Sequence, residues 1–138
     1  VLFYEGMTLL VTARKGDRKR MRYVRRLLKR LKTWATYCPS NFLGKQYFLE
    51  AEIAMVKGDK LEAIAKYYSS ILHAREGGFI VQEALANERM AKLRLASGDE
   101  AAAAPFLEEA CRLYGVWGGT EKLQHLKEEI AQRRCLKG

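Results

Sequence analysis

Apolar residues recur at three- and four-residue intervals along the chain, and no segment alternates like a half-buried β-strand. The segment around Ile53 carries two apolar stripes at helical spacing, formed by Leu43, Tyr47, Ala51 and Ala54 and by Leu49, Ile53 and Val56. A helix that is apolar on two sides is expected to lie between two neighbouring helices. The pattern therefore predicts an all-α fold.

The dipeptide Gly-Asp marks three predicted turns, which begin at Gly16, Gly58 and Gly98 and so recur with a nearly constant period. Gly adopts the left-handed conformation that ends a helix, and Asp accepts hydrogen bonds from the first N–H groups of the next. A period of about 40 residues is typical of stacked helical hairpins. We expect about seven helices, near residues 2–14, 17–37, 42–57, 60–76, 80–97, 100–116 and 120–134. Ser40 or Asn41 is expected to cap the third.

These helices are expected to form one domain over residues 1–138. Three hairpins cover about residues 1–38, 41–78 and 80–118, and a mostly polar helix follows at 119–135. Because a terminal repeat needs a polar outer face, we expect this helix to cap the stack. The chain opens on Val rather than Met, and we interpret it as a fragment of a longer protein.

The middle hairpin, from Tyr47 to Ala74, reads YFLEAEIAMVKGDKLEAIAKYYSSILHA. Its small residues Ala51, Ala63 and Ser70 and its large Tyr47 and Tyr67 resemble those of a tetratricopeptide repeat with lengthened helices. The resemblance implies antiparallel helical hairpins stacked as a right-handed, tetratricopeptide-like solenoid.

The segment from Gly77 to Glu129 resembles the end of the helical-repeat region of large multi-sensor hybrid kinases. The matching pieces are EALANE from Glu83, the pair Ala91-Lys92, Gly98-Asp99, and YGVWG from Tyr114. In that family a Ser/Thr-kinase-like domain and an AAA-type ATPase precede the repeats, and GAF or PAS sensor and histidine-kinase domains follow. The resemblance implies a linker scaffold inside a signalling protein, whose parent carries kinase and ATPase domains.

The composition fits a domain that folds around its own core. The chain has 138 residues, of which 49% are apolar and 30% charged. No run approaches the roughly 20 apolar residues of a membrane helix. Its three cysteines lie outside any zinc-ligand spacing, so we expect free thiols in a reducing, cytoplasmic setting.

The net charge of +9 is concentrated in one segment, because 11 basic residues and one acid lie between Arg14 and Lys32. The predicted basic face of this helix consists of Arg18, Lys19, Arg22, Arg25, Arg26, Lys29, Arg30 and Lys32. It fits three interpretations: a solvated helix face, a site for an acidic protein surface, or a site for nucleic acid or anionic lipid. Tyr23 and Trp34 are expected on the apolar side, which argues against single-stranded nucleic acid.

The concave surface of a tetratricopeptide array is lined by the first helix of each hairpin. In this chain the predicted protein-binding groove contains Lys45, Phe48, Glu52, Asn87, Glu88, Lys92 and Leu95. The alternative is that these residues make inter-repeat contacts or are solvated charges. Asn87 is polar in a packed helix, where an internal hydrogen bond is the simpler interpretation.

We find no arrangement of residues that would carry catalysis. The chain has neither a phosphate-binding G-x-x-x-x-G-K-[ST] loop nor a glycine-rich kinase loop, and neither His73 nor His125 has a second ligand at helical spacing. We therefore expect a non-enzymatic segment without metal or cofactor. The expected function is a protein-interaction or interdomain signal-relay scaffold, with nucleic-acid or anionic-membrane binding as the alternative.

Overall fold

The computed structural model describes residues 18–137, with side chains from Arg18 to Arg133. This part of the chain contains six helices and no strand, which confirms the predicted all-α class. The helix expected at 2–14 and the turn at Gly16 lie outside the described residues. The helices are α2 (Arg18–Tyr37), α3 (Pro39–Lys57), α4 (Lys60–Gly77), α5 (Ile80–Ala96), α6 (Glu100–Trp117) and α7 (Thr120–Lys137).

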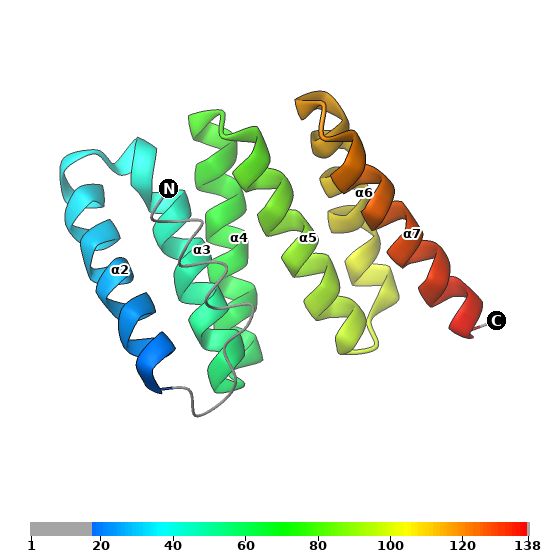
Figure 1. Cartoon of the computed structure of the whole chain (residues 1–138), viewed down its shortest axis with the longest axis horizontal. Coiled ribbons are helices and arrows are strands. Elements are labelled where there is room, and N and C mark those ends of the chain that lie inside the picture. The colour runs from blue at the N-terminus through cyan, green and yellow to red at the C-terminus, as the bar shows by residue number, and fades with distance from the viewer. Residues whose placement is uncertain (1–17, 138) are drawn as a thin grey trace.

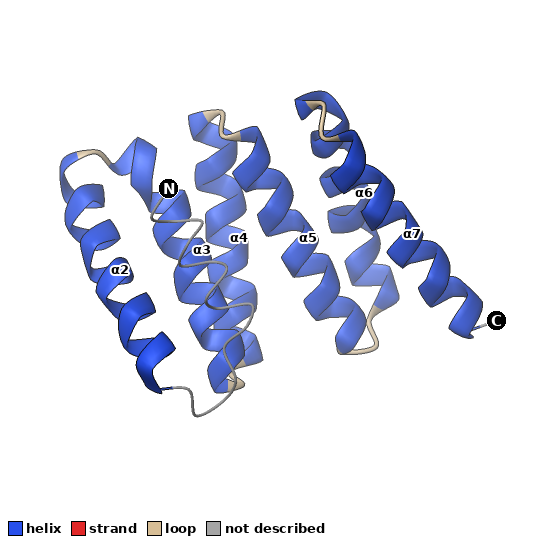
Figure 2. Ribbon diagram, in the orientation of Figure 1, coloured by secondary structure: helices blue, strands red, loops and turns tan. Residues whose placement is uncertain are grey.

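The helices cross the molecule in chain order, from α2 at one end to α7 at the other (Figure 1). Each helix packs against its described neighbours in the chain, and further contacts join α3 to α5 and α5 to α7. Loops of a few residues reverse the chain direction between them (Figure 2). Because contacts join near neighbours in the chain, the arrangement is built from local pairs of helices.

The inter-helix turns use the chemistry that the Gly-Asp pattern predicts. Gly58 and Gly98 have φ values of 83° and 80°, a conformation that side chains disfavour. Asp59 Oδ1 accepts from the Glu62 N–H at 3.1 Å, and Asp99 Oδ1 accepts from the Ala102 N–H at 3.0 Å. The positive-φ glycines of the described residues are evenly spaced, at positions 58, 78, 98 and 118. One helix and its turn therefore occupy the same length of chain throughout this part of the protein.

The start of α3 differs from the predicted one. The helix begins at Pro39, and its N-cap is Cys38 rather than Ser40 or Asn41. Pro is tolerated in the first helical position because the N–H that it lacks has no partner inside the helix. The Pro39 ring thus starts the helix earlier than side-chain capping would.

Two clusters of buried apolar side chains form the core. The larger cluster joins α2, α3, α4 and α5 and includes Leu31, Phe48 and Tyr67. The smaller cluster joins α5, α6 and α7 through residues such as Tyr114 and Leu126. Helix α3 is buried on the sides that face α2 and α4, as its two apolar stripes predict.

Small buried residues recur from one hairpin to the next and let neighbouring helices approach closely. Ser70 Oγ donates to the Gly44 carbonyl oxygen at 2.8 Å, which brings α3 and α4 together. A Cβ on Gly44 would lie 3.3 Å from the Ala74 nitrogen and 2.8 Å from Gln82 Nε2. The buried residues at equivalent positions of the two hairpins are Gly44 and Ala84, Ala51 and Ala91, Ala63 and Ala103, and Ser70 and Ala110. The hairpins α3–α4 and α5–α6 therefore share one packing pattern.

The left-handed turn conformation predicts opposite effects for two Gly→Ala substitutions. Gly58→Ala should lower the free energy of unfolding by about 1 kcal/mol, because φ is positive although the space around Gly58 is open. Gly115→Ala, inside α6 and with ordinary contact distances, should raise it by about 0.5 kcal/mol. Urea unfolding followed by far-UV circular dichroism measures both. Equal effects of the two substitutions would contradict the turn assignment.

Candidate functional site

The predicted groove residues divide into buried and accessible side chains. Phe48, Glu52, Asn87 and Glu88 are each at most 2% exposed, so they do not offer a surface to a partner. Lys45, Lys92 and Leu95 remain partly exposed. The sequence placed the four buried residues on an open surface because their spacing fits the first helix of each hairpin. In the structure that face of α3 and α5 packs against neighbouring helices.

The buried Glu52 side chain on α3 is hydrogen-bonded to both α4 and α5. Its carboxylate on α3 accepts a hydrogen bond from the Tyr67 hydroxyl on α4 at 2.9 Å. It also accepts two from the Arg89 guanidinium on α5, from Nε at 2.7 Å and from Nη2 at 2.9 Å. Burial lowers the pKa of Arg89, but the Glu52 carboxylate outweighs this effect and raises it overall. Burial, and then the charge of Glu52, raise the pKa of Tyr67.

Glu88 makes a similar connection one hairpin later. Its carboxylate on α5 accepts from the Tyr114 hydroxyl on α6 at 2.8 Å. Lys92 Nζ lies 2.8 Å from it, and Lys122 Nζ on α7 lies 3.2 Å from it. Burial raises the pKa of Glu88, but hydrogen bonding and charge from Lys92, with Tyr114 and Lys122, lower it overall. Glu88 is therefore a structural anion rather than a groove charge.

Asn87 has an internal partner. Its Nδ2 donates to the Glu83 carbonyl oxygen at 2.9 Å, which is the hydrogen bond that its position in a packed helix predicts.

Lys92, besides its contact with Glu88, lies 3.3 Å from Glu129 on α7. Of the predicted groove, Lys45 and Leu95 are therefore the accessible side chains not joined to a carboxylate in the described part of the chain.

The predicted basic face lies on the outside of α2. All eight of its side chains are exposed, whereas Val24, Leu27, Leu31 and Ala35 of the same helix are buried. Helix α2 contains no acidic residue, and none of the eight has a carboxylate partner among the described residues. The face consists of Arg18, Lys19, Arg22, Arg25, Arg26, Lys29, Arg30 and Lys32.

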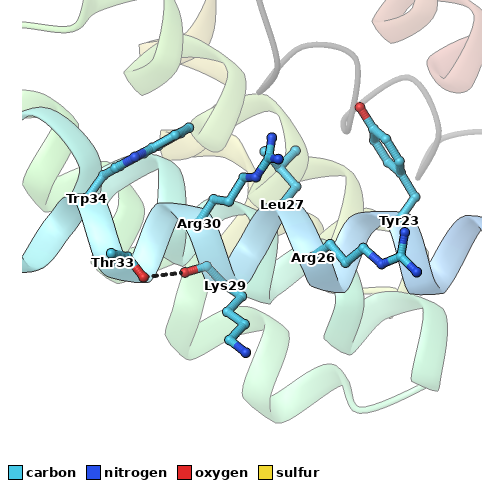
Figure 3. A pocket seen from close by; sticks show the side chains of 7 residues that line it. All are labelled: Tyr23, Arg26, Leu27, Lys29, Arg30, Thr33 and Trp34. Carbon is cyan, nitrogen blue, oxygen red and sulfur yellow. Dashed lines mark hydrogen bonds between the residues drawn. The ribbon is translucent and has the colours of Figure 1, made fainter.

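Tyr23 and Trp34 lie on the same side of α2 as the buried Leu27, as the sequence predicts, but they are more exposed than that position implied (Figure 3). Tyr23 is 37% exposed and Trp34 is 36% exposed, and the Trp34 ring lies 5.6 Å from the Phe42 ring of α3. Together with Leu27 and Arg30, Tyr23 and Trp34 project from the same side of α2 (Figure 3). An open groove of about 500 Å³ is lined by these four residues together with Arg26, Lys29 and Thr33. The helix therefore offers cations and aromatic rings together.

Other chemistry is sparse in residues 18–133. No group of three metal-ligating side chains comes together among them. His73 stacks on the Tyr47 ring at 5.2 Å, and His125 Nε2 lies 2.9 Å from Glu129. Cys38 and Cys111 are free, whereas the Cys135 side chain lies outside the described residues. Helices of residues 18–137 are too short or too polar to cross a bilayer.

Comparisons with protein-family models, curated proteins and solved structures found no match to this chain. The site is therefore argued from its own geometry.

Sequence reasoning missed the partners of the buried acids. Arg89 lies 37 residues from Glu52, and Tyr114 lies 26 residues from Glu88, so no local pattern joins them. One signal was present, because Glu52 sits between Ala51 and Ile53 in a helix predicted to be apolar on two sides. A charge in such a helix needs a buried partner.

The Glu52 network predicts a large stability loss when Arg89 is removed. Arg89→Met should lower the free energy of unfolding by about 3 kcal/mol, because it leaves a buried carboxylate without its cation. Adding Glu52→Gln should recover part of this loss, since the remaining group is neutral. Arg112→Met, in an exposed pair with Glu109, should have almost no effect. Chemical denaturation of the four proteins checks this, and a large effect of Arg112→Met would argue against it.

The lowered pKa of Glu88 predicts an acid-sensitive stability. A carboxyl whose pKa is lower in the folded state stabilises the protein above its ordinary pKa of 4.5 and loses that contribution as the pH falls through the folded value. Unfolding free energies measured between about pH 7 and pH 3 should thus fall more steeply for the wild type than for Glu88→Gln. Parallel curves for the two proteins would show that Glu88 does not contribute.

Proposed function

We propose that the chain is a helical-repeat scaffold that binds an acidic protein surface through the basic face of α2. The observation that carries this proposal is the row of eight exposed cations, on a helix without acids, at one end of a series of packed hairpins. Guanidinium groups bind carboxylates with paired hydrogen bonds, and five of the eight cations are arginines.

The stacking itself is proposed as a right-handed solenoid of the tetratricopeptide type. Three features support it: contacts between successive helices, the contact of α3 with α5, and small buried residues at equivalent positions of successive hairpins. A stack of this kind needs few long-range contacts and leaves extended faces open to partners. The resemblance to multi-sensor hybrid kinases favours a neighbouring domain of the same chain, or a signalling partner, as the source of the acidic surface.

A second candidate is single-stranded nucleic acid, and the exposed Tyr23 and Trp34 favour it. Base stacking on aromatic rings beside a cationic row is the common arrangement for such binding. The two rings are about three helical turns apart on α2, a rise of about 16 Å, with Arg26 and Arg30 between them.

Charge reversal tests the proposal. The triple variant Arg22→Glu, Arg25→Glu and Lys29→Glu should weaken binding to an acidic helical peptide at least about tenfold, because each change replaces attraction by repulsion. The matched control reverses three exposed lysines elsewhere, Lys57, Lys60 and Lys127, with the same change in net charge. Titration by fluorescence anisotropy at about 50 and 200 mM salt measures both.

The same titration decides between partners. Tighter binding to a single-stranded oligonucleotide than to the peptide, weakened by Tyr23→Ala and Trp34→Ala, would replace the proposal with the second candidate. Preferential binding to anionic vesicles would assign the face to a membrane surface. Equal weakening by the control variant, or no binding to the peptide at low salt, would refute the acidic-protein proposal.

A further inference from the structure

A separate pocket lies where the beginning of α5 meets the beginning of α3 and the end of α6. Its volume is about 370 Å³, within the range of small-ligand sites, and none of its lining residues belongs to α2. Its walls are mostly apolar, from Phe79, Ile80 and Trp117, and its polar side chains are those of Lys45 and Gln82. A mostly apolar pocket with two polar side chains is the usual composition of a ligand site.

Lys45 brings an uncompensated positive charge to this pocket. Its Nζ donates to the Asn41 carbonyl oxygen at 3.2 Å and lies 4.3 Å from the centre of the Phe79 ring. No carboxylate pairs with it among the described residues, and burial lowers the pKa of its ammonium group. An anion at this point would supply the missing counter-charge.

Gln82 provides the second observation. The residue is 4% exposed, lines the pocket, and its Nε2 has no hydrogen-bond partner. The nitrogen lies against Gly44, where a Cβ would approach it to 2.8 Å. A buried donor without an acceptor is unfavourable, so a ligand oxygen that accepted a hydrogen bond from the Gln82 carboxamide would be stabilised.

The beginning of α5 adds to the positive potential. Asp59 and Asp99 cap α4 and α6 with side-chain oxygens, whereas Phe79 gives α5 no side-chain cap. The first N–H groups of a helix attract anions. Glu83, the acid in the first turn of α5, is already paired with Arg75 at 3.0 Å.

We infer that this pocket binds a monocarboxylate with an apolar body. The carboxylate would lie between the Lys45 ammonium, the Gln82 carboxamide and the start of α5, and the apolar body against Phe79, Ile80 and Trp117. A single cation favours one negative charge over a phosphate dianion, and the apolar walls favour an aliphatic group. Such a ligand is either the C-terminal residue of a peptide or a free aliphatic acid.

The first test compares N-acetyl-leucine with its amide, which keeps the same apolar body without the charge. We expect the acid to shift the NMR signals of the Val81 and Gln82 backbone amides, the Gln82 carboxamide and the Trp117 indole, and to bind at least about tenfold more tightly than the amide. Equal responses to acid and amide, shifts confined to other residues, or preferential binding of inorganic phosphate would overturn the inference.

The second test uses variants of the 138-residue chain. Lys45→Met should weaken binding of the acid about tenfold and leave binding of the amide unchanged. Lys57→Met, an exposed lysine on the same helix, is the matched control and should change neither. Lys45→Arg keeps the charge and should retain binding, which guards against a folding defect in Lys45→Met. The same loss in Lys57→Met, or full binding by a folded Lys45→Met, would contradict the site.

The source of the ligand is read from two further probes. Tighter binding of an acetylated tripeptide ending in Leu than of 4-methylvalerate supports the pocket as a peptide C-terminus site. The reverse order supports it as a site for a free aliphatic acid. Absence of binding for both would overturn the inference.

Discussion

Two buried carboxylates, Glu52 and Glu88, constrain how successive helices pack. A carboxylate removed from water is stable only where cations and hydroxyl groups meet it at close range. Glu52 is satisfied by groups from α4 and α5, and Glu88 by groups from α5, α6 and α7. Any slippage of one helix along its neighbour would leave a charge unpaired. These acids therefore fix the relative positions of the helices more strictly than apolar packing alone.

The close approach of the helices makes these ionic contacts reachable. Small residues at Gly44, Ser70 and their counterparts in the next hairpin bring the backbones together. With the Glu52 and Glu88 carboxylates paired inside the stack, the largest group of exposed cations without a carboxylate partner among the described residues lies on α2. This separation between an ionic interior and a cationic end is the reason why we propose α2 as the interaction surface.

Local chemistry made much of the fold predictable. Gly followed by Asp located two turns because both residues act on the adjacent backbone, and apolar spacing located the helices. The predicted start of α3 was wrong because a different local rule applied there. Proline is favoured in the first turn of a helix, so α3 begins at Pro39 without a side-chain cap.

The candidate site was less predictable because it depends on contacts distant in the chain. The positions of Arg18 to Lys32 on one exposed face followed from helical periodicity. The burial of Glu52 and Glu88 did not, since their partners come from other helices. Nor did the exposure of Tyr23 and Trp34, because a neighbouring helix decides how much of a ring it covers. The pocket at Lys45 and Gln82 needed three helix ends to meet.

The most direct test of the account is to map the contact surface of an acidic helical peptide on the intact chain by NMR. Binding through the basic face predicts that backbone shifts concentrate in residues 18–32 and diminish as salt is raised. Shifts centred on α3 to α7, or shifts indifferent to salt, would contradict the assignment of α2 as the interaction surface.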